Sequence, residues 1–403
     1  MSEDLSRRSI RRRPLLLALA GGGAALTGIG VAARTGVLSG GDGNPSRSGV
    51  LRLAGGDGGM PSLELRLTDD LLVAEGAQRW VSEPLPTSTF SMVGVTWLRS
   101  EAAPVVEVSA RSAGGWTPWQ PMPHVHEPTA SVEDTRTAGT DVAWTGPADG
   151  IRVRVVGSRP RGLALVLLNP EPLPGDEVLP PPPATGGKGS VGIAGSAARS
   201  PLKPHMYRRR EWGANERWRD GTADYNRTIK QVHVHHTVNS NDYGRADVPA
   251  MIRGMYRYHT KSLGWSDIGY NFLVDRFGRI WIGRAGGAKR PVRGAHTLGF
   301  NGTSTGVAVI GNYDVVQPSR KVIGAIARLA AWKLHRYGRD PEGRVRVESE
   351  GSDRYSYGRK VTLPTIDGHR DTNETACPGK HLYAALPRIR RRAAKRIRHF
   401  ERR

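Results

Sequence analysis

Hydrophobic and polar residues alternate with a period of two in several short runs between about residues 50 and 168. Such alternation is typical of half-buried β-strands, and Gly, Pro and Asp separate the runs as turn residues would. No segment of this region has the spacing of an amphipathic helix. We therefore predict an all-β, sandwich-like accessory domain over residues 49–170. The expected strands are residues 63–67, 90–97, 105–110, 151–156 and 163–168.

From about residue 204 the pattern combines short apolar strands with longer segments of helical spacing, which predicts an α/β domain over residues 204–390. One helix is expected from Asp247, as its N-cap, to about Leu263. A second is expected from about Ser319 to Tyr337, with Gly338 as its stop signal. We expect a mixed β-sheet flanked by helices. Its strands would be residues 231–236, 270–275, 279–283 and 306–311.

Two segments of biased composition flank the accessory domain. Residues 171–203 are rich in proline and then in glycine and serine, so we predict a linker that leaves the two domains spaced and mobile. Residues 34–48 are rich in Gly, Ser and Arg, and we expect them to be disordered. Trp116 and Trp119 lie in a Gly- and Pro-containing loop of the accessory domain. They could stack on sugar rings, but core packing is the interpretation we favour.

Residues 1–33 resemble a twin-arginine signal peptide. The segment Ser6–Arg12 contains two arginine pairs, and an apolar Gly- and Ala-rich run follows from Leu15 to Ala33. The alternative is an N-terminal membrane anchor, but the glycines make the run weakly hydrophobic. We therefore expect a secreted, extracellular protein associated with the cell wall, with no stable membrane anchor after removal of the signal.

Charge is unevenly distributed along the 403 residues. The net charge of +22 divides into about +3 for residues 1–33, −2 for residues 34–170 and +21 for residues 171–403. A basic surface favours polyanions, either nucleic acid or the anionic polymers of a cell wall. The export signal and the lack of a nucleic-acid motif argue against nucleic acid as a partner. Residues 391–403 read as a basic tail, which is either simply solvated or binds wall polymer.

Candidate chemistry is concentrated in two distant segments, Gln231–Thr237 and Gly368–Gly379. Strand alternation places His233 and His235 on one face of the first segment. The second segment holds a histidine and the only cysteine of the chain, which excludes an intramolecular disulfide. Imidazole and thiolate are ligands of tetrahedral zinc sites, and three protein ligands leave one position for a water. The alternative is a buried structural thiol and structural histidines, and spacing alone does not choose between His233 and His235.

Four further motifs lie between these two segments in a characteristic order. They are Trp265–Val274, Asp275–Arg284, Gly294–Asn301 and Gly306–Tyr313. Together with the histidine and cysteine segments they closely resemble the peptidoglycan recognition protein family, which is similar to zinc-dependent N-acetylmuramoyl-L-alanine amidases of the bacteriophage lysozyme type. The resemblance covers about residues 204–390.

The resemblance implies a zinc hydrolase that cleaves the amide between muramic acid and the L-alanine of the peptidoglycan stem peptide. It implies His235, His369 and Cys377 as the metal ligands. Non-enzymatic members of the family lack this cysteine, so its presence favours an enzyme over the alternative, a peptidoglycan-binding protein without catalytic activity.

The resemblance also implies roles for residues around the metal. Tyr270 matches a tyrosine that would donate a hydrogen bond to the zinc water or the oxyanion, and the alternative role for it is core packing. Thr375 lies where the phage-type enzymes carry a lysine, as a second polar stabiliser. The candidate substrate-binding residues are Trp212, His259, Tyr270 and His296.

Overall fold

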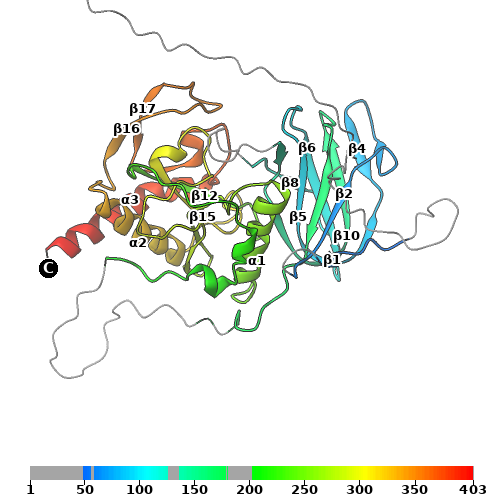
Figure 1. Ribbon diagram of the computed structural model, residues 1–403, viewed down its shortest axis with the longest axis horizontal. Helices are drawn as coiled ribbons and strands as arrows, with labels where there is room; N and C mark the ends of the chain where they lie inside the picture. The colour runs from blue at the N-terminus through cyan, green and yellow to red at the C-terminus, as the bar shows by residue number, and fades with distance from the viewer. Residues whose placement is uncertain (1–48, 56–58, 126–135, 178, 180–201, 403) are drawn as a thin grey trace, which may run out of the picture. The chain divides into compact units, whose positions relative to one another are not determined.

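The computed structural model describes residues 49–55, 59–125, 136–177, 179 and 202–402 (Figure 1). The expected signal peptide, the expected disordered segment 34–48 and most of the expected linker lie outside the described residues. Residues from Asp42 to Arg403 cluster as one compact unit. Within this unit we call residues 49–177 the β domain and residues 202–402 the amidase domain.

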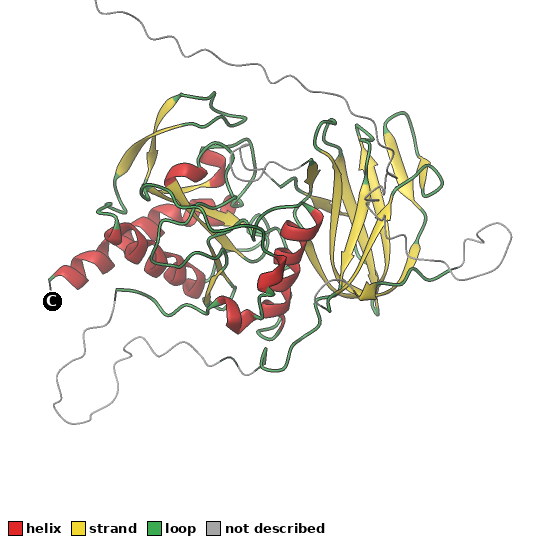
Figure 2. Cartoon of the chain, viewed as in Figure 1, coloured by secondary structure: helices red, strands yellow, loops and turns green. Residues whose placement is uncertain are grey.

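The β domain is built from strands alone in the part that the structure describes, which confirms the predicted all-β class (Figure 2). The long strand β10 organises it, because its first half pairs with β5 and its second half pairs with β6 and β4. The strands are β1 (Ala54–Gly55), β2 (Pro61–Arg66), β3 (Leu72–Ala74), β4 (Arg79–Ser82), β5 (Leu85–Leu98), β6 (Val105–Ser112), β7 (Gly115–Trp116), β8 (Gln120–Met122), β9 (Thr137–Gly139), β10 (Ala143–Val156) and β11 (Ala164–Leu168).

Alternation along β10 shows why this sequence forms a half-buried strand. Ile151, Val153 and Val155 are fully buried in the core of the β domain, whereas Arg152 and Arg154 face the other side. These arginines stack on the rings of two tryptophans, and the guanidinium of Arg154 lies 4.0 Å from the ring centroid of Trp119.

Trp116 also contacts this arginine face, with the Arg152 guanidinium 4.5 Å from its ring centroid. Both Trp116 and Trp119 are only half-buried. The expectation that they pack in the core was therefore wrong. Trp116 and Trp119 lie over strand positions whose side chains point away from the core, so arginine guanidinium groups rather than apolar core side chains contact their rings.

The amidase domain contains the predicted mixed sheet, in the strand order β14-β13-β15-β12-β18. Three neighbouring pairs are parallel, and β13 and β14 are antiparallel. A separate hairpin, β16 and β17, packs Val347 and Leu363 against Phe300. The strands are β12 (Gln231–His236), β13 (Phe272–Val274), β14 (Ile280–Ile282), β15 (Ser304–Val309), β16 (Arg344–Glu348), β17 (Lys360–Pro364) and β18 (Ile366–Gly368).

The first two long helices begin close to their predicted positions. α1 (Asp247–Arg257) continues as a π-helical turn, η3 (Tyr258–Ser262). Asp247 is not the N-cap but the first helical residue, and its carboxylate accepts a hydrogen bond from Gly244 N. α2 (Arg320–Arg336) begins directly after Ser319, close to the expected start, and the Ser319 hydroxyl caps it by accepting from the Val322 amide.

The third helix, α3 (Lys380–Glu401), corrects the expected boundary at residue 390. The segment read as a basic tail continues the helix, and Ala393, Ala394 and Ile397 are buried. They share one hydrophobic cluster with α2 because α3 presents an apolar residue on the same face every three or four positions. None of the helices in the described part of the chain combines the length and the apolar character needed to cross a bilayer.

The β domain and α1 share a closely packed face. The hydroxyl of Tyr258 donates to the carbonyl of Val95 on β5 at 3.1 Å, and Trp144 N donates to the Asn239 side chain at 2.8 Å. A Cβ added at Gly94 would lie 2.5 Å from the Tyr258 ring, so glycine is what permits this approach. Apolar residues of both domains form a single buried cluster.

The start of the expected linker is also attached to α1. Arg253 and Asp176 form an ion pair at 2.7 Å in which both side chains are only 5% exposed, and Arg253 also donates to the carbonyl of Glu171 at 2.8 Å. The expectation of spaced, mobile domains was therefore wrong. Sequence composition describes a segment's own stiffness and not the partners that it meets in the fold.

Candidate metal centre

Strand β12 positions the first candidate ligand. Its neighbours β15 and β18 pair with it on both sides, so the strand is central and every one of its residues is buried. His233 and His235 share one face, as alternation predicts, since both lie beside His296 with ring centroids 6.0 and 5.0 Å away. His236 points to the other face, where its Nδ1 accepts from Tyr313 N.

The structure brings together the three residues that the resemblance implies as ligands. One ligand atom from each of His235, His369 and Cys377 lies within 4.8 Å of the others. The Cys377 sulfur is 3.7 Å from His235 Nδ1, and the rings of His235 and His369 are 4.6 Å apart. His369 follows directly after β18, and a hydrogen bond from Arg370 N to Cys377 O folds the cysteine segment back onto it.

The donor set fits a zinc ion. Zn–N and Zn–S bonds of about 2.0–2.3 Å in a tetrahedron place neighbouring ligand atoms roughly 3.5 Å apart, which the sulfur–nitrogen distance approaches. Burial raises the pKa of the Cys377 thiol. The backbone amide of His236, which donates a hydrogen bond to the sulfur, lowers this pKa in part. A thiolate at this buried position therefore needs a cation beside it.

His296 is buried and lies against His235. It is 3% exposed, and its Nδ1 lies 3.1 Å from His235 Nε2. A metal on His235 Nδ1 would leave the proton on Nε2, so that His235 donates to His296. Burial lowers the pKa of His296 well below its ordinary value, which keeps it a neutral acceptor. The expected substrate-binding role of His296 stays a prediction, and the contact that the structure shows is the one with His235.

Tyr270 lies beside the candidate ligands. Its ring centroid is 5.6 Å from that of His235, and its side chain is half-buried. Burial raises the pKa of Tyr270 well above its ordinary value, and the charges of Asp141 and Cys377 raise it further. The phenol therefore keeps its proton at neutral pH and can act as a hydrogen-bond donor.

His259 lies behind Tyr270, with a ring centroid distance of 6.0 Å. It is 2% exposed, stacks against Trp265 and accepts a hydrogen bond from Gly269 N at its Nδ1. Burial lowers the pKa of His259 to about 3. Through these contacts His259 supports the segment that carries Tyr270. Little of the His259 surface stays exposed for contact with a substrate.

Thr375 and Trp212 have different surroundings from those expected. The Thr375 hydroxyl accepts from Cys377 N at 3.1 Å, so it shapes the turn that carries the ligand. Trp212 is fully buried, donates to the Ile282 carbonyl and packs against Tyr256. The expectation that Trp212 contacts the substrate directly was therefore wrong. The motif identified the position of this residue in the sequence, but it did not indicate that the side chain is buried.

Two features of the site escaped the sequence analysis. His233 pairs with Asp367 of β18 at 2.7 Å, and both are fully buried. Asp141, from the loop that precedes β10, raises the pKa of both Tyr270 and Cys377 through its charge. Asp367 directly precedes the Gly368 segment and could have been noticed there. No local signal marked Asp141, since its proximity depends on the packing of the two domains.

Two family models match the chain. The model described as "N-acetylmuramoyl-L-alanine amidase" matches residues 225–380, and the model described as "Rv3811 N-terminal galactose-binding domain-like" matches residues 60–179. The first match contains all three candidate ligands. The second agrees with the all-β fold of the β domain.

Individual relatives match the amidase half. Peptidoglycan-recognition protein SC1a of Drosophila melanogaster is 30% identical over 176 residues, which cover 43% of this chain and 79% of the relative. N-acetylmuramoyl-L-alanine amidase of Homo sapiens is 31% identical over 187 residues, which cover 45% of this chain and 28% of the relative. Among solved structures, wild-type Drosophila PGRP-LB aligns with a TM-score of 0.35 and 26% identity, covering 45% of this chain and 92% of that chain.

Proposed function

Since the chain belongs to the family of peptidoglycan-recognition proteins and N-acetylmuramoyl-L-alanine amidases, we propose that it is a zinc-dependent amidase of peptidoglycan. The bond cleaved is the amide between muramic acid and the L-alanine of the stem peptide. The observation that carries the proposal is the convergence of His235, His369 and Cys377 from two distant segments. A binding protein has no need of a thiolate at this position.

His235, His369 and Cys377 would hold the zinc. When bound, the ion polarises the carbonyl of the amide and lowers the pKa of a water ligand to about 7. His296 fixes the orientation and tautomer of His235 through the 3.1 Å contact. The cysteine turn is fixed by Thr375 and by the contact between Arg370 N and Cys377 O.

Tyr270 supplies the donor at the reacting centre in this proposal. Its phenol, protonated at neutral pH, donates a hydrogen bond to the oxygen on which negative charge develops. His259 and Trp265 hold the segment around Gly269, so the phenol is positioned before the substrate arrives. Thr375 accepts from the backbone, and its hydroxyl proton remains available to donate to the substrate.

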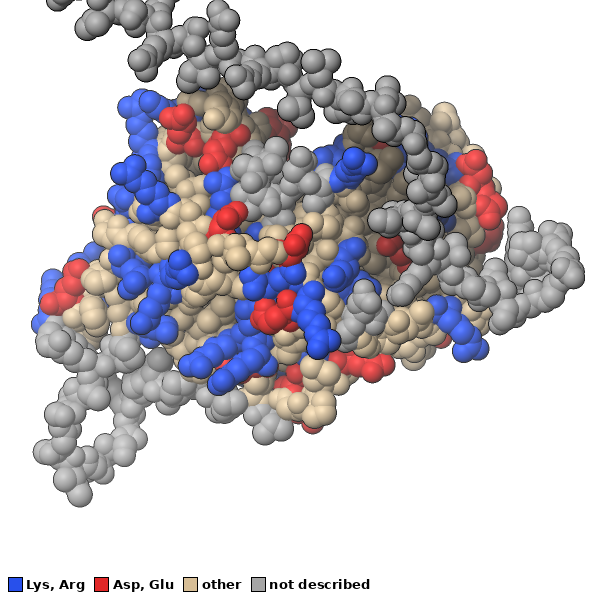
Figure 3. Space-filling model, viewed as in Figure 1, with Lys and Arg blue, Asp and Glu red and all other residues tan. Residues whose placement is uncertain are grey.

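Export and attachment to the wall form a second part of the proposal. Residues 1–33 would direct twin-arginine export, and the basic amidase domain would bind anionic wall polymers. Figure 3 shows many Lys and Arg side chains on the face drawn, over the region where Figure 1 draws β16, β17, α2 and α3. Exposed cations on α3 include Arg388, Arg391 and Lys395.

Mass spectrometry of muropeptides tests the reaction. Purified full-length protein with one equivalent of zinc is incubated with peptidoglycan, beside a Cys377→Ser variant. Free stem peptides and peptide-free glycan are expected from the wild type only. A wild type that sediments with peptidoglycan but releases no stem peptide would replace the proposal with a binding function.

A further inference from the structure

We propose that the β domain has a glycan-binding surface of its own, and that its ligand is peptidoglycan glycan from which the stem peptides have been removed. We call this surface the arginine–tryptophan ladder. It consists of Arg111, Trp116, Arg152, Trp119 and Arg154. The surface is separate from the candidate metal centre, and it rests on the proposed function only for the source of its ligand.

Guanidinium groups and indole rings alternate along the ladder. The ring centroid of Trp116 lies 5.7 Å from the guanidinium of Arg111 and 4.5 Å from that of Arg152. The ring centroid of Trp119 lies 5.2 Å from the guanidinium of Arg152 and 4.0 Å from that of Arg154. Arg152 is therefore the central member, with one indole ring on each side of it along the ladder.

Backbone pairing holds the two tryptophans in place independently of the arginines. Trp116 of β7 is the register partner of Arg111 on β6. Between the tryptophans, Thr117 N donates to Ala110 O at 2.9 Å, and the Thr117 hydroxyl accepts from Ala110 N at 3.1 Å. Neither tryptophan belongs to the core cluster of the β domain. The rings are thus presented by a fixed loop, as recognition groups must be.

The amidase domain packs against a different part of the β domain. Its contacts are with β5 and the first half of β10, through Gly94 and Trp144. The ladder instead lies on β6, on the second half of β10 and on the segment from β7 to Trp119, and its side chains are half-buried. Within the described part of the chain, no residue of the amidase domain forms a hydrogen bond, ion pair or ring contact with them. This face is therefore open to a ligand.

The charge of the ladder is compensated at its ends but not at its centre. Arg111 pairs with Asp149 at 2.8 Å, and Arg154 pairs with Glu107 at 2.9 Å. Arg152 donates to a serine hydroxyl at 3.2 Å, and no carboxylate among the described residues contacts it. One uncompensated positive charge fits an isolated carboxylate better than a polymer of dense negative charge.

The indole rings supply the complementary apolar surface. Both are half-buried, and within the described residues neither Trp116 nor Trp119 donates its indole N–H to a protein acceptor. An indole ring offers its apolar face to the C–H groups of a sugar and its N–H to a sugar hydroxyl. Tryptophan and arginine are also the residues in which binding energy is most often concentrated. A sugar that carries a carboxylate therefore matches the ladder.

The proposed reaction produces such a sugar. Hydrolysis adds water across the C–N bond of the amide, so the lactyl group of muramic acid becomes a carboxylate and the stem peptide leaves with a free amine. In uncleaved glycan the same carbonyl belongs to an uncharged amide. Each muramic acid of peptide-free glycan thus joins a sugar ring to one carboxylate, which a guanidinium binds through two parallel hydrogen bonds.

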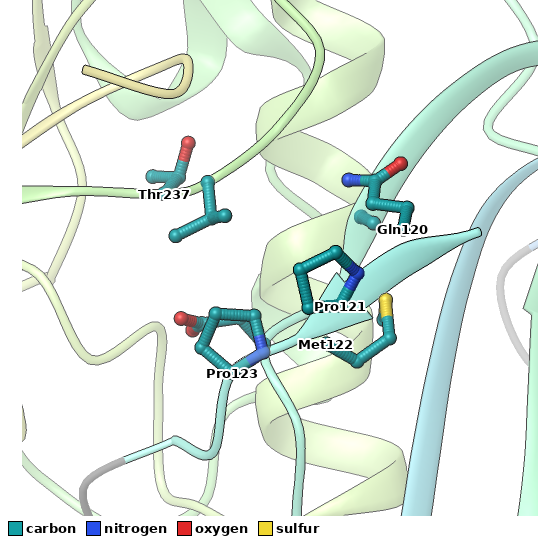
Figure 4. A pocket seen from close by; sticks show the side chains of 8 residues that line it. Gln120, Pro121, Met122, Pro123 and Thr237 are labelled. Carbon is teal, nitrogen blue, oxygen red and sulfur yellow. The ribbon is translucent and has the colours of Figure 1, made fainter. Parts of the chain in front are cut away.

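The ladder adjoins the strand that meets the amidase domain near the candidate metal centre. β8 begins one residue after Trp119, and its residues line a small hollow together with Thr237 and Val238, which directly follow β12. Figure 4 shows the side chain of Thr237 opposite those of Gln120 to Pro123. Cleaved glycan bound on the ladder would therefore keep the enzyme on a strand whose remaining stem peptides are still to be cut.

The test measures binding by full-length, zinc-loaded proteins to three ligands that are not substrates. These are a peptide-free peptidoglycan oligomer, a neutral N-acetylglucosamine oligomer of equal length, and polyphosphate. The wild type should prefer the peptide-free oligomer. Arg152→Gln should weaken its binding about 10-fold and abolish the preference over the neutral oligomer. Trp119→Ala should weaken binding of both oligomers, Trp119→Phe should do so less, and the exposed β-domain control Arg66→Gln should match the wild type.

Thermal midpoints and hydrolysis of a small soluble muramyl peptide are measured for every variant, and both should stay near the wild-type values. If Arg152→Gln unfolds, the two Trp119 variants decide, because affinity should fall from tryptophan to phenylalanine to alanine. Equal affinity of the wild type for the two oligomers, unchanged affinity in the folded variants, or tighter binding of polyphosphate would overturn the inference. A wild type that binds the peptide-free oligomer as expected but releases no stem peptide would support the ladder and refute the hydrolase.

Discussion

The metal centre and the face shared by the two domains are built from opposite kinds of residue. At the candidate metal centre, the proposed function depends on side chains that carry lone pairs, His235, His369 and Cys377, gathered around the end of β12. At the shared face, close contact depends on a missing side chain, since Gly94 makes room for the ring of Tyr258. Changes at the first place should therefore abolish chemistry with the fold retained. Changes at the second should weaken the fold with the metal retained.

The largest effect is expected for Cys377→Ser. Serine is a poor zinc ligand, so zinc should fall from one equivalent to nearly none and hydrolysis should disappear. The measurements are elemental analysis after dialysis and release of stem peptide. His399→Gln, an exposed histidine on α3, is the matched control and should keep both. Full zinc occupancy in Cys377→Ser would exclude the sulfur as a ligand.

Tyr270→Phe should separate chemistry from metal binding within the same centre. The change removes one donor and keeps the ring, so kcat should fall about 10²-fold at unchanged zinc content. Steady-state kinetics with a soluble muramyl peptide measure the change. If kcat stays at the wild-type value, Tyr270 has a packing role only.

Gly94→Val should affect the shared face and leave the metal in place. The new Cβ would lie 2.5 Å from Tyr258 Cε2, and relief of such overpacking costs about 1–3 kcal/mol of unfolding free energy. Denaturant unfolding and zinc analysis measure the two effects. Gly114→Val is the control, because nothing lies within 4 Å of its added Cβ.

Adding Tyr258→Ala to Gly94→Val sharpens this test. The smaller side chain removes the obstacle, so the double variant should lose less stability than the sum of the two single variants. Additive losses would show that the two residues do not meet in solution, and that the close domain contact is absent there.

His259, the residue after Tyr258, gives a smaller and pH-dependent effect. Burial lowers its folded-state pKa to about 3, below the unfolded value of about 6.5, so between these values the unfolded chain binds more protons. Its contribution to stability is therefore present above pH 6.5 and is lost, by about 1.4 kcal/mol per pH unit, as the pH falls toward 3. The stability difference between wild type and His259→Gln should narrow accordingly between pH 7 and pH 4. A constant difference would mean that His259 is accessible to protons in the folded state.

The weakest effect is expected at the exposed basic side of α3. Replacing Arg388, Arg391 and Lys395 with glutamine should reduce sedimentation with cell walls by a few-fold at low salt, and the difference should vanish as salt screens exposed charges. Hydrolysis of small soluble muropeptides should not change. Substitution rather than truncation is required, because α3 also buries Ile397. The control is a β-domain variant in which Arg52, Arg66 and Arg79 are replaced with glutamine. If this control loses as much wall binding, the effect depends on net charge alone and not on α3.

Local patterns in the sequence were sufficient for several features. Alternating residues predicted the second half of β10, residues 151–156, and the two histidines on one face of β12, and Ser319 and Gly338 marked the ends of α2. The candidate ligands His235, His369 and Cys377 could be named because the resemblance to a known family points to these positions. These features depend on periodicity and residue type, which the sequence states directly.

Only the tertiary structure decided where the remaining groups lie. Trp212 became a core residue, His296 a partner of His235, and the end of the chain a packed helix. Asp141 influences the pKa of Tyr270 and of Cys377 because the two domains pack together, and no residue near position 141 predicts this packing. The physical reason is that a side chain's environment is set by segments far along the chain. Burial, hydrogen-bond partners and pKa shifts therefore arise only when those segments meet.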